Sequence, residues 1–550
     1  MKRNGARILI DTLVDLGVKT VFGYPGGAVL NIYDELYLNS ERIAHVLAAH
    51  EQGAAHAADG YARVTGKPGV VISTSGPGAT NLVTGIANAY LDSVPMLAIT
   101  GNVSIPLLGR DSFQEVDIVG ITQPIVKHSY MVRRTEDLER TIREAYALAL
   151  SGRPGPVLVD IPKSVQIDEA ESVPYSKDDS GALPNPAALP EFAKCLELIR
   201  ACERPCLYLG GGVMQANEQA IALAEKIGAP ITLSLMGLAA VPHSHPLNLG
   251  MSGMHGQYAA SMAQSRADLL IACGVRFSDR ATGNTEKFAK NRAIIHIDID
   301  EAEFGKNVAP GVALHGELSA ALSALLAAAP QKNNAAWLAE LEEYKKISAA
   351  QSEMELNPAS VIRTVHDCIE DDGAIVATDV GQHQMWVAQH YPFEKPRTLL
   401  TSGGLGTMGF GLGAAIGGCV AAGKKRTVLF TSDGSFGMNL NELATAVSQG
   451  LPIVIILLNN GVLGMVRQWQ AAFYGQRFSQ TTLGRKTDFV ALTKSFGGVA
   501  QRIGSLAELR EALKNLPGDC PALIECPIDP DERVLPMIPP GGSIENIILN

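Results

Sequence analysis

Two turns in the last third of the chain carry oxygen-bearing side chains that suit a divalent cation. The first contains Asp433 and follows an apolar, β-branched run at residues 426–431, and the second contains Asn460 and follows a similar run at residues 451–458. A hard cation such as Mg²⁺ takes carboxylate, amide and backbone carbonyl oxygens together with the oxygens of a bound phosphate. Asp433, Asn460 and the carbonyl of Val462 supply such a set, so the pattern predicts a metal site.

The elements that flank these turns must bring them together. The two apolar runs have the length of buried strands, and residues 439–448 between them repeat their apolar side chains at helical spacing. This order predicts a β-α-β unit whose parallel strands place Asp433 and Asn460 at one edge of a sheet, where open α/β sheets bind ligands. Gly434 allows phosphate to approach the backbone, and the start of the helix offers N–H donors to it.

The alternative for each turn taken singly is an ordinary surface turn. Taken together, the turns resemble the GDG…NN signature of thiamine-diphosphate enzymes, with Ser432 in place of the first glycine. Residues 463–470, Leu-Gly-Met-Val-Arg-Gln-Trp-Gln, are similar to the catalytic subunit of acetohydroxyacid synthase, also called acetolactate synthase. The resemblance covers essentially the whole chain and implies a diphosphate and Mg²⁺ site that also includes Gly381, Gln382, His383, Ser435 and Met438.

Glu51 is the catalytic residue that the resemblance implies. It stands beside the start of a predicted helix, where a glutamate is ordinarily a favourable charge on the helix dipole. The preceding His50 also suggests a zinc protease, but the next histidine is His56, which breaks the HExxH spacing. In the thiamine-diphosphate family this carboxyl group hydrogen-bonds the aminopyrimidine of the cofactor and so promotes removal of the C2 proton of the thiazolium.

Two further segments resemble the substrate-binding parts of the family, although alone each would be taken for a surface loop. They cover residues 111–117 and 123–128. The match implies that Phe113, Gln114 and Lys127 line the substrate, with catalytic roles for Gln114 and Lys127.

Two more residues are implied for a second substrate. Arg280 offers a planar guanidinium, the usual partner of a carboxylate, and is expected to bind the carboxylate of a second 2-keto acid. Trp469 follows Asn460 in a stretch that can form a helix over the cofactor. The family match assigns its indole to the side chain of that acid, whereas the commoner fate of tryptophan is the core or an interface.

Glycine-rich and acidic turns follow the strands expected in the middle of the chain. Residues 204–213, 249–256, 274–280 and 296–300 each end or follow an apolar run, which favours a nucleotide cleft with Arg276 on a phosphate. The resemblance implies an FAD site, a structural inheritance in a reaction without net redox, formed by Arg153, Gly211, Gly212, His255, Gly274, Arg276, Asp298 and Asp300.

A glycine run at residues 404–409 matches the GxGxxG pattern and invites a nicotinamide interpretation. The acidic residue expected about 20 positions later is absent, since residues 424–426 are all basic. The resemblance implies instead that Gly406 offers a carbonyl to the 4′-amino group of the cofactor and that Met408 props the cofactor into its bent form. Gly413 stands where the family usually has proline, which predicts a less rigid helix start.

The composition is that of a compact globular protein. The chain has 550 residues, 46% of them hydrophobic and 18% charged, with a net charge of −11. These values predict about three domains and argue against a nucleic-acid partner. The eight cysteines lack CxxC spacing and the chain starts in an amphipathic helix, so we expect a cytoplasmic, bacterial protein with reduced thiols. The uncharged run at residues 398–423 holds many glycines and is not expected to span a membrane.

Strand and helix patterns alternate along the chain, which predicts the α/β class. The resemblance implies three doubly wound parallel-sheet domains of the thiamine-diphosphate enzyme type. They are a pyrimidine-binding domain, an FAD-binding domain and a diphosphate and Mg²⁺-binding domain, followed by a C-terminal lid, at residues 1–175, 188–332, 358–530 and 531–550. A Pro- and Ser-rich linker is expected at residues 166–190 and a charged helical connector at residues 332–351.

The implied reaction is decarboxylation of pyruvate on thiamine diphosphate and transfer of the hydroxyethyl unit to a second keto acid. A second pyruvate gives 2-acetolactate, and 2-ketobutyrate gives 2-aceto-2-hydroxybutyrate, in branched-chain amino-acid biosynthesis. We expect a homodimer or a dimer of dimers with a separate small regulatory subunit.

Two rivals stay open at this point. A pyruvate oxidase or decarboxylase on the same scaffold is disfavoured by the segments around Arg280 and Trp469. A flavin-holding subunit with a degraded thiamine site is suggested by Ser432 and Gly413, and it is disfavoured because Glu51 and both side-chain metal ligands are present.

Overall fold

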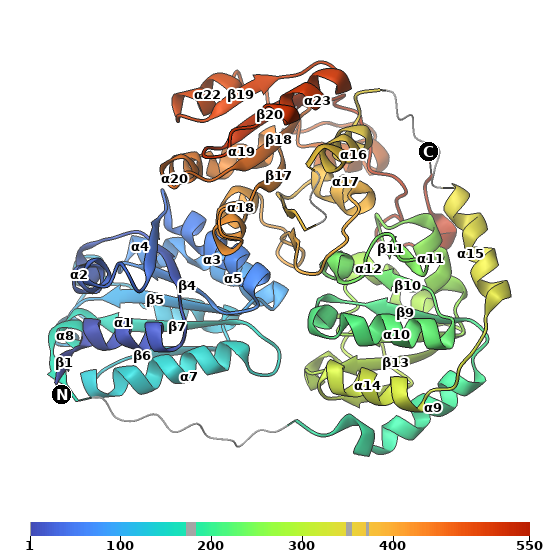
Figure 1. The fold of residues 1–550 in the computed structure, drawn as a ribbon, viewed down its shortest axis with the longest axis horizontal. Helices are drawn as coiled ribbons and strands as arrows, with labels where there is room; N and C mark the ends of the chain where they lie inside the picture. The colour runs from blue at the N-terminus through green and yellow to red at the C-terminus, as the bar shows by residue number, and fades with distance from the viewer. Residues whose placement is uncertain (1, 172–182, 348–354, 370–372, 550) are drawn as a thin grey trace.

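The computed structural model describes residues 2–171, 183–347, 355–369 and 373–549, and its strands include three six-stranded sheets (Figure 1). Every pair of neighbouring strands within these sheets is parallel. Because parallel sheets need crossover connections, helices lie on the sheet faces. The prediction of an α/β fold with three doubly wound domains is confirmed.

The first sheet has the order β3-β2-β4-β5-β7-β6. Its strands are β2 (Thr20–Gly23), β3 (Ala44–Leu47), β4 (Gly69–Ser73), β5 (Met96–Asn102), β6 (His128–Met131) and β7 (Pro156–Pro162). Successive side chains of a strand point to opposite faces. Val70 therefore joins the core beneath α1 (Gly5–Asp15) and α7 (Leu138–Leu150). Val71 joins the opposite core, beneath α3 (Glu51–Thr65), so both faces of the sheet are buried.

The central sheet has the order β11-β10-β9-β12-β13-β14. Its strands are β9 (Pro205–Leu209), β10 (Ile231–Leu233), β11 (Asn248–Met251), β12 (Leu269–Cys273), β13 (Ala293–Asp298) and β14 (Val312–His315). Helices α10 (Asn217–Ile227) and α14 (Leu318–Ala328) contribute to one core. Helices α11 (Tyr258–Arg266) and α15 (Ala335–Ile347) contribute to another. The predicted connector includes α15, and its last residues, 348–351, lie outside the described part.

The third sheet has the order β16-β15-β17-β18-β20-β19. Its strands are β15 (Ile375–Thr378), β16 (Leu399–Leu400), β17 (Thr427–Ser432), β18 (Ile453–Asn459), β19 (Val499–Arg502) and β20 (Ala522–Pro527). Strands β17 and β18 are parallel neighbours. The predicted β-α-β unit is therefore present, with its two turns at the same sheet edge.

The helix between β17 and β18 differs from the prediction at its start. It begins directly after the strand as α19 (Asp433–Asn439), passes through the 3₁₀ turn η9 (Leu440–Glu442) and ends with α20 (Leu443–Ser448). The prediction of a helix over residues 439–448 is confirmed, but residues 433–438, which were expected to form a turn, are helical as well. Glycines with low helix propensity hide these first turns in the sequence. Burial of Phe436 stabilises those turns in the structure.

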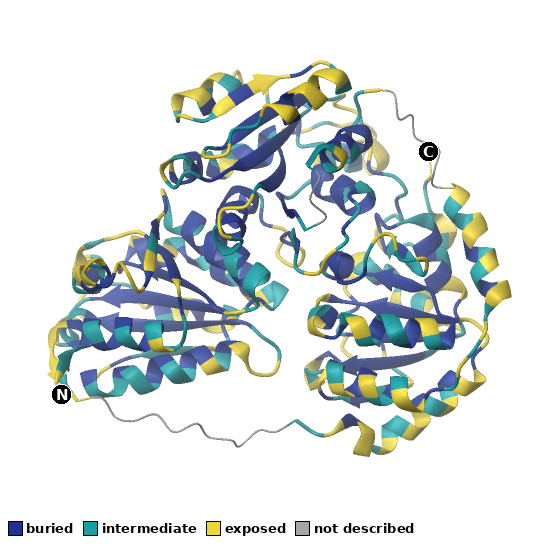
Figure 2. Cartoon of the chain, in the orientation of Figure 1, coloured by how far each residue is buried: buried dark blue, intermediate teal, exposed yellow. Residues whose placement is uncertain are grey.

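Helix α3 of the first domain packs against α18 (Phe410–Ala421) of the third (Figure 1). Small residues permit the approach, because a Cβ on Gly417 would lie 1.8 Å from the carbonyl oxygen of Ala57. The two helices belong to one core, and Figure 2 shows buried residues on both. The first and third domains therefore share one hydrophobic core.

The two segments that join the domains differ, since the second one contains α15. The predicted linker starts within α8 (Lys163–Ile167) and β8 (Glu169–Ala170), and residues 172–182 lie outside the described part. The C-terminal segment runs from the third domain to the central one, where the N–H of Ile538 donates to the carbonyl of Met254 at 2.8 Å. Within the described ranges no helix is both long and apolar enough to cross a membrane.

Candidate active site

Asp433 lies at the carboxyl end of β17, as the first residue of α19. Its side chain is buried, and its Oδ1 has no hydrogen-bond partner among the described residues. Burial raises the pKa of Asp433 to about 6, against the opposite effect of nearby backbone N–H groups. A buried carboxylate oxygen is costly unless a cation or a proton satisfies it. The site therefore fits a metal ion.

Asn460 directly follows β18 and so lies at the same sheet edge as Asp433. Its Nδ2 donates to Oε1 of Gln382 at 3.5 Å, and its Oδ1 accepts from the N–H of Val462 at 3.2 Å. Gln382 is held in turn by donating to Oε1 of Gln468 at 3.0 Å. This chain of amides fixes the orientation of Asn460, while a carbonyl oxygen keeps a second lone pair for a cation.

A narrow cleft of about 70 Å³ lies beside this edge, lined among others by Gly381, His383, Met408 and Val462. Nε2 of His383 is buried and has no partner within the described ranges. Burial lowers the pKa of His383 to about 3, so its imidazole is neutral. Gly381 has φ of +147°, a conformation that favours glycine, where the chain turns from β15 into α17 (Gln382–His390). The cleft thus gathers residues predicted for the diphosphate.

Three other predicted cofactor residues are not among those that line the cleft. Ser435 donates from Oγ to the carbonyl of Val380 at 3.3 Å. Gly406 has φ of +69°, which favours glycine. Met438 is 55% exposed, and its Cβ would lie 3.1 Å from a Cβ on Gly409. Their contacts with a cofactor stay predictions.

The two departures from the family pattern have structural explanations. Ser432 ends β17 with φ of −132°, an extended conformation that any residue adopts, so the serine is tolerated there. A Cβ on Gly413 would lie 2.7 Å from Cβ of His56 and 2.9 Å from the carbonyl oxygen of Gly53. A larger residue at position 413 would therefore collide with α3, which explains the glycine.

Glu51 begins α3 and makes its contacts within the first domain. Nδ2 of Asn81 donates to its Oε2 at 2.9 Å. A Cβ on Gly78 would lie 3.2 Å from its Oε1, so only glycine leaves this oxygen unobstructed. Burial and the charge of Glu51 raise the pKa of Tyr33. The carboxylate is thus fixed by one oxygen and offers the other.

The segment with Phe113 and Gln114 lies against the turn at Gly76, two residues before the glycine that faces Glu51. A Cβ on Gly76 would lie 2.8 Å from the backbone oxygen of Gln114, so the two loops are in contact. Phe113 is 87% exposed and Gln114 has φ of +58°. The structure brings Glu51, Phe113 and Gln114 to one part of the first domain.

Lys127 directly precedes β6, and its ammonium group reaches the carboxyl end of α7. Its Nζ donates to the carbonyls of Leu148 at 2.6 Å and Ser151 at 2.5 Å, which is a favourable place for a cation. Burial lowers the pKa of Lys127 to about 8, although the charge of Asp300 opposes this. The structure shows these capping contacts, and a contact with substrate stays a prediction.

The glycines of the central domain meet at the ends of β9 and β12. A Cβ on Gly210 would lie 1.9 Å from the carbonyl oxygen of Gly274, and a Cβ on Gly212 would lie 2.9 Å from Cα of Gly274. Gly211 is exposed at the same turn. These turns stand at the carboxyl edge of neighbouring parallel strands, where nucleotides bind in open α/β sheets.

Charged residues of this edge connect the central domain to the first one. Arg153 donates to Glu303 at 2.7 Å and to Asp300 at 3.3 Å. Arg276 donates to the carbonyl of Leu91, and burial with the charge of Arg153 lowers the pKa of Arg276. Asp298, which is also predicted for this site, accepts from the N–H of Asp300 at 3.0 Å. The buried atoms without a partner among the described residues include Oγ of Ser252, Nδ1 of His255 and Oε2 of Glu303, groups that suit a polar ligand.

Arg280 and Trp469 come together from different domains. The guanidinium carbon of Arg280 lies 5.2 Å from the ring centroid of Trp469, within the range of a cation–π contact. Nε1 of Trp469 is buried without a partner in the described part. Trp469 belongs to α21 (Gly464–Phe473), and Met465 and Val466 on this helix line the cleft. The two residues predicted for the second substrate therefore contact each other next to a helix that lines the cleft.

Two functional positions were missed by sequence reasoning. Asp379, at the end of β15, is buried and accepts from the N–H of Gly409 at 2.7 Å and from Oγ1 of Thr431 at 3.1 Å. Gln468 accepts from the N–H of Val534 at 3.0 Å and donates to its carbonyl at 3.1 Å, which ties the C-terminal segment to α21. An acid directly after a predicted strand is a signal that could have identified Asp379, whereas nothing local marks Gln468.

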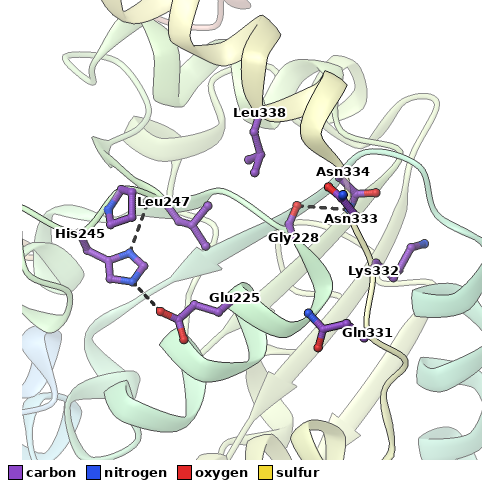
Figure 3. Close-up of a pocket in the computed structure, with 10 residues that line it drawn as sticks. Glu225, Gly228, His245, Leu247, Gln331, Lys332, Asn333, Asn334 and Leu338 are labelled. Atoms are coloured by element: carbon purple, nitrogen blue, oxygen red, sulfur yellow. Dashed lines mark hydrogen bonds and ion pairs between the residues drawn. The ribbon is translucent and has the colours of Figure 1, made fainter.

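A larger hollow lies in the central domain, between the end of α10 and the start of α15 (Figure 3). His245 contacts Glu225 at 3.2 Å, and Nδ2 of Asn334 donates to the carbonyl of Gly228 at 3.2 Å. Lys332 caps α9 (Pro190–Ala201) by donating to the carbonyl of Arg200 at 3.2 Å. These four polar side chains of the hollow are thus engaged with the protein, and none of the predicted site residues lines the hollow.

Comparison with known families identifies the class of protein. The chain matches the N-terminal TPP binding domain of thiamine pyrophosphate enzymes over residues 3–121, their central domain over residues 192–325, and their C-terminal TPP binding domain over residues 379–526. The fold and the site therefore define an enzyme that binds thiamine diphosphate.

Individual relatives narrow this class. The chain is 46% identical to the probable acetolactate synthase large subunit of Methanocaldococcus jannaschii over 99% of this chain and 95% of that protein. It is 45% identical to the acetolactate synthase large subunit of Lactococcus lactis over 99% and 96%, and 45% identical to that of Escherichia coli isozyme 1 over 98% and 96%. The chain belongs to the acetolactate synthase large-subunit family.

Proposed function

We propose that this chain releases CO₂ from pyruvate and joins the remaining two-carbon unit to a second pyruvate or to 2-ketobutyrate. The products are 2-acetolactate and 2-aceto-2-hydroxybutyrate, in the biosynthesis of valine, leucine and isoleucine. The observation that carries the proposal is the contact between Arg280 and Trp469 beside the cleft. A synthase must bind a second keto acid, which a simple decarboxylase does not.

The residues of the cleft would hold the cofactor by complementary chemistry. Bound thiamine diphosphate supplies a thiazolium carbon that accepts the electron pair released with CO₂. Asp433, Asn460 and the carbonyl of Val462 would hold Mg²⁺, whose preferred ligands are such oxygens. Glu51 would share a proton with the ring nitrogen of the aminopyrimidine through the carboxylate oxygen that Asn81 leaves free.

The substrate end of the site would discriminate by charge and shape. Arg280 would pair with the carboxylate of the second keto acid, and the indole of Trp469 would pack on its alkyl group. The C-terminal segment, fixed by Gln468, would exclude water from the cleft. Phe113 and Gln114 would approach from the part of the first domain that carries Glu51.

We also propose that the central domain binds FAD without reducing it in turnover. The glycine turns at β9 and β12 would admit the dinucleotide, and Arg276 would face its phosphates. The unpartnered atoms of Ser252 and His255 support a polar ligand at this edge. The purified protein should be yellow, and its flavin spectrum should stay unchanged while acetolactate forms.

The active assembly that we propose is at least a homodimer, with a small regulatory subunit as an additional partner. The relatives are named large subunits, which supports a separate small one. Glu51 makes its contacts within its own domain, so a second copy of the chain would bring a metal cleft to it.

A colorimetric acetolactate assay on the purified chain tests the proposed reaction. We expect product from pyruvate only when thiamine diphosphate, Mg²⁺ and FAD are all present, without consumption of an electron acceptor. An oxidase would require the acceptor and form no acetolactate, and a decarboxylase would release acetaldehyde as its main product. Either result contradicts the proposal.

A further inference from the structure

Two carboxylates, one in the first domain and one in the third, each accept hydrogen bonds from the backbone of the other domain. Glu442 of η9 in the third domain accepts from the N–H of Ala49 at 3.2 Å and from the N–H of His50 at 3.0 Å. Asp92, the last residue of α5 (Val83–Asp92) in the first domain, accepts from the N–H of Gly403 at 3.0 Å and of Gly404 at 2.7 Å. Each carboxylate therefore holds two consecutive N–H groups of the other domain.

The bonds of Glu442 end directly before the predicted catalytic residue, because Ala49 and His50 precede Glu51. Glu442 is 1% exposed, and Oγ1 of Thr445 donates a further hydrogen bond to it at 2.7 Å. Burial raises the pKa of Glu442, while the hydrogen bonds from Thr445, Ala49 and His50 favour the charged form. The two backbone bonds fix the chain where α3 begins, and with it the direction in which the Glu51 side chain leaves the helix.

The bonds of Asp92 end directly before the other segment expected to face the cofactor. Gly403 and Gly404 lead into the loop with Gly406 and Met408. A Cβ on Gly404 would lie 2.9 Å from Oδ1 of Asp92, so this glycine permits the close approach. Contact with a protein carboxylate thus accounts for Gly404, the first glycine of the GxGxxG match.

A buried cation completes the second contact. Arg63 donates to Asp92 at 2.9 Å and to Asp59 at 2.5 Å, and the side chains of Asp59 and Asp92 have no exposed surface. Burial alone would lower the pKa of Arg63, but Asp59 and Asp92 raise it overall. A buried ion pair of this kind is costly to break on one side only, so Arg63 holds the Asp92 side chain in position.

We propose that Glu442 and Asp92 are positioning residues that form reciprocal clamps, each fixing the cofactor-facing segment of the opposite domain. The inference rests on the proposed function for the roles of Glu51, Gly406 and Met408. A carboxylate offers an acceptor oxygen to each of two N–H groups, whereas an amide offers one oxygen and turns an NH₂ group against the other donor. The clamps act within one chain, whichever chain completes the site.

The test compares Glu442→Gln and Asp92→Asn with a matched control in the assembled holoenzyme. The control is Glu394→Gln, because Glu394 also accepts a backbone N–H across a domain joint, from Ser244 at 3.0 Å, but lies outside the site. The first readout is amide hydrogen exchange, followed by mass spectrometry, in peptides that cover residues 45–52 and 400–407. The second is the rate at which bound thiamine diphosphate exchanges its C2 proton at saturating cofactor.

We expect amide exchange to rise at least tenfold over residues 45–52 in Glu442→Gln and over residues 400–407 in Asp92→Asn. C2 proton exchange should slow at least tenfold in both, with wild-type values for the control. Wild-type amide exchange in both variants overturns the clamps, whatever the reaction proves to be. Faster amide exchange with an unchanged C2 rate leaves the contacts structural and overturns their positioning role.

Two additions keep these outcomes distinct. If wild type forms no acetolactate, the proposed function fails, and the amide exchange still decides whether the clamps hold the two segments. If Glu442→Gln does not fold, Glu442→Asp retains the charge on a shorter side chain and should give an intermediate slowing of C2 exchange. A wild-type C2 rate in folded Glu442→Asp would then overturn the proposal.

Discussion

The carboxyl group of Glu51 is held on one side by Asn81 and is unobstructed by Gly78 on the other. Replacement by glutamine keeps an oxygen that Asn81 can bond, so the fold should persist, but the amide cannot share a proton with the pyrimidine. We expect Glu51→Gln to lower turnover by about 10²–10⁴-fold, the range of general acid–base catalysis. C2 proton exchange of bound cofactor should slow in parallel, while the melting temperature stays at the wild-type value. An unchanged exchange rate would remove Glu51 from its assigned role.

Trp469 is the residue expected to separate pyruvate from 2-ketobutyrate, which differ by one methylene. A methylene in an apolar pocket is worth about 1–3 kcal/mol, or roughly 10–200-fold in selection. We expect wild type to prefer 2-ketobutyrate as acceptor and Trp469→Leu to lower that preference about tenfold. Competition between the two keto acids, scored by the product ratio, measures it.

A matched control for this variant lies one helical turn away. The ring of Phe473 meets the ring of Trp469 edge-on at 5.9 Å, yet it is 42% exposed. Phe473→Leu should leave the product ratio close to wild type. Should Trp469→Leu behave like this control, the indole is structural and the selection arises elsewhere.

Asp160 predicts a pH dependence of stability that has no direct link to catalysis. It is buried and accepts from Thr100 at 2.7 Å and Asn102 at 2.6 Å, and burial, assisted by the charge of Asp117, raises the pKa of Asp160 to about 7 despite these bonds. The folded chain therefore keeps a proton between about pH 4 and 7 that the unfolded chain loses. Stability from this group is present at low pH and is lost as pH rises through 7.

Asp160→Asn should remove that loss. The asparagine can still accept from Asn102 and donate to Thr100, so the free energy of unfolding should fall less than in wild type between pH 5 and 8, by about 1–3 kcal/mol. Chemical denaturation at both pH values measures the difference. The exposed Asp34→Asn should follow wild type. Parallel pH curves for wild type and Asp160→Asn would contradict the prediction.

At the scale of helices and strands, the contact between α3 and α18 constrains the site because it joins the first and third domains. Ala should replace a helical Gly favourably by about 1 kcal/mol on propensity alone, but a Cβ on Gly417 would lie 1.8 Å from a backbone oxygen of α3. We expect Gly417→Ala to destabilise the protein by about 1–3 kcal/mol through overpacking. It should also lower activity, because α18 follows the loop with Met408.

Thermal unfolding and acetolactate assays measure both effects. The control is Gly518→Ala, since Gly518 is exposed and a Cβ there meets no atom within 4 Å. This variant should unfold and turn over like wild type. A melting temperature of Gly417→Ala at or above the wild-type value would show that the two helices can separate at little cost.

Complementation between chains tests the arrangement of the whole molecule. Glu51 and the metal cleft lie in different domains, and a dimer in which each site takes one part from each chain predicts rescue. Mixing Glu51→Gln with Asp433→Ala should restore up to about a quarter of wild-type activity. About half of the dimers are then mixed, and one of the two sites in each mixed dimer is intact. Each variant alone should stay inactive. Failure to complement after demonstrated subunit exchange would mean that each chain builds its own site.

The sequence alone determined the features that depend on short stretches. Period and length of apolar runs predicted the parallel strands, and the residues that directly follow a strand, such as Asp433 and Asn460, were correctly expected at one edge. Parallel neighbours must place their carboxyl ends together, so this juxtaposition needs no knowledge of the remaining packing. The start of α19 was misplaced because glycines conceal a helix that burial stabilises.

Tertiary structure alone decided contacts between residues far apart in the chain. The sequence gives no local signal that Glu442 bonds the backbone before Glu51, that Asp92 bonds Gly403, or that Lys127 caps α7. Such contacts depend on how whole domains pack, and a polar side chain finds its partner only after burial removes water as an alternative. The sequence therefore sufficed to place Asp433 and Asn460 at one sheet edge, whereas the groups that hold the surrounding segments in place were decided by packing between domains.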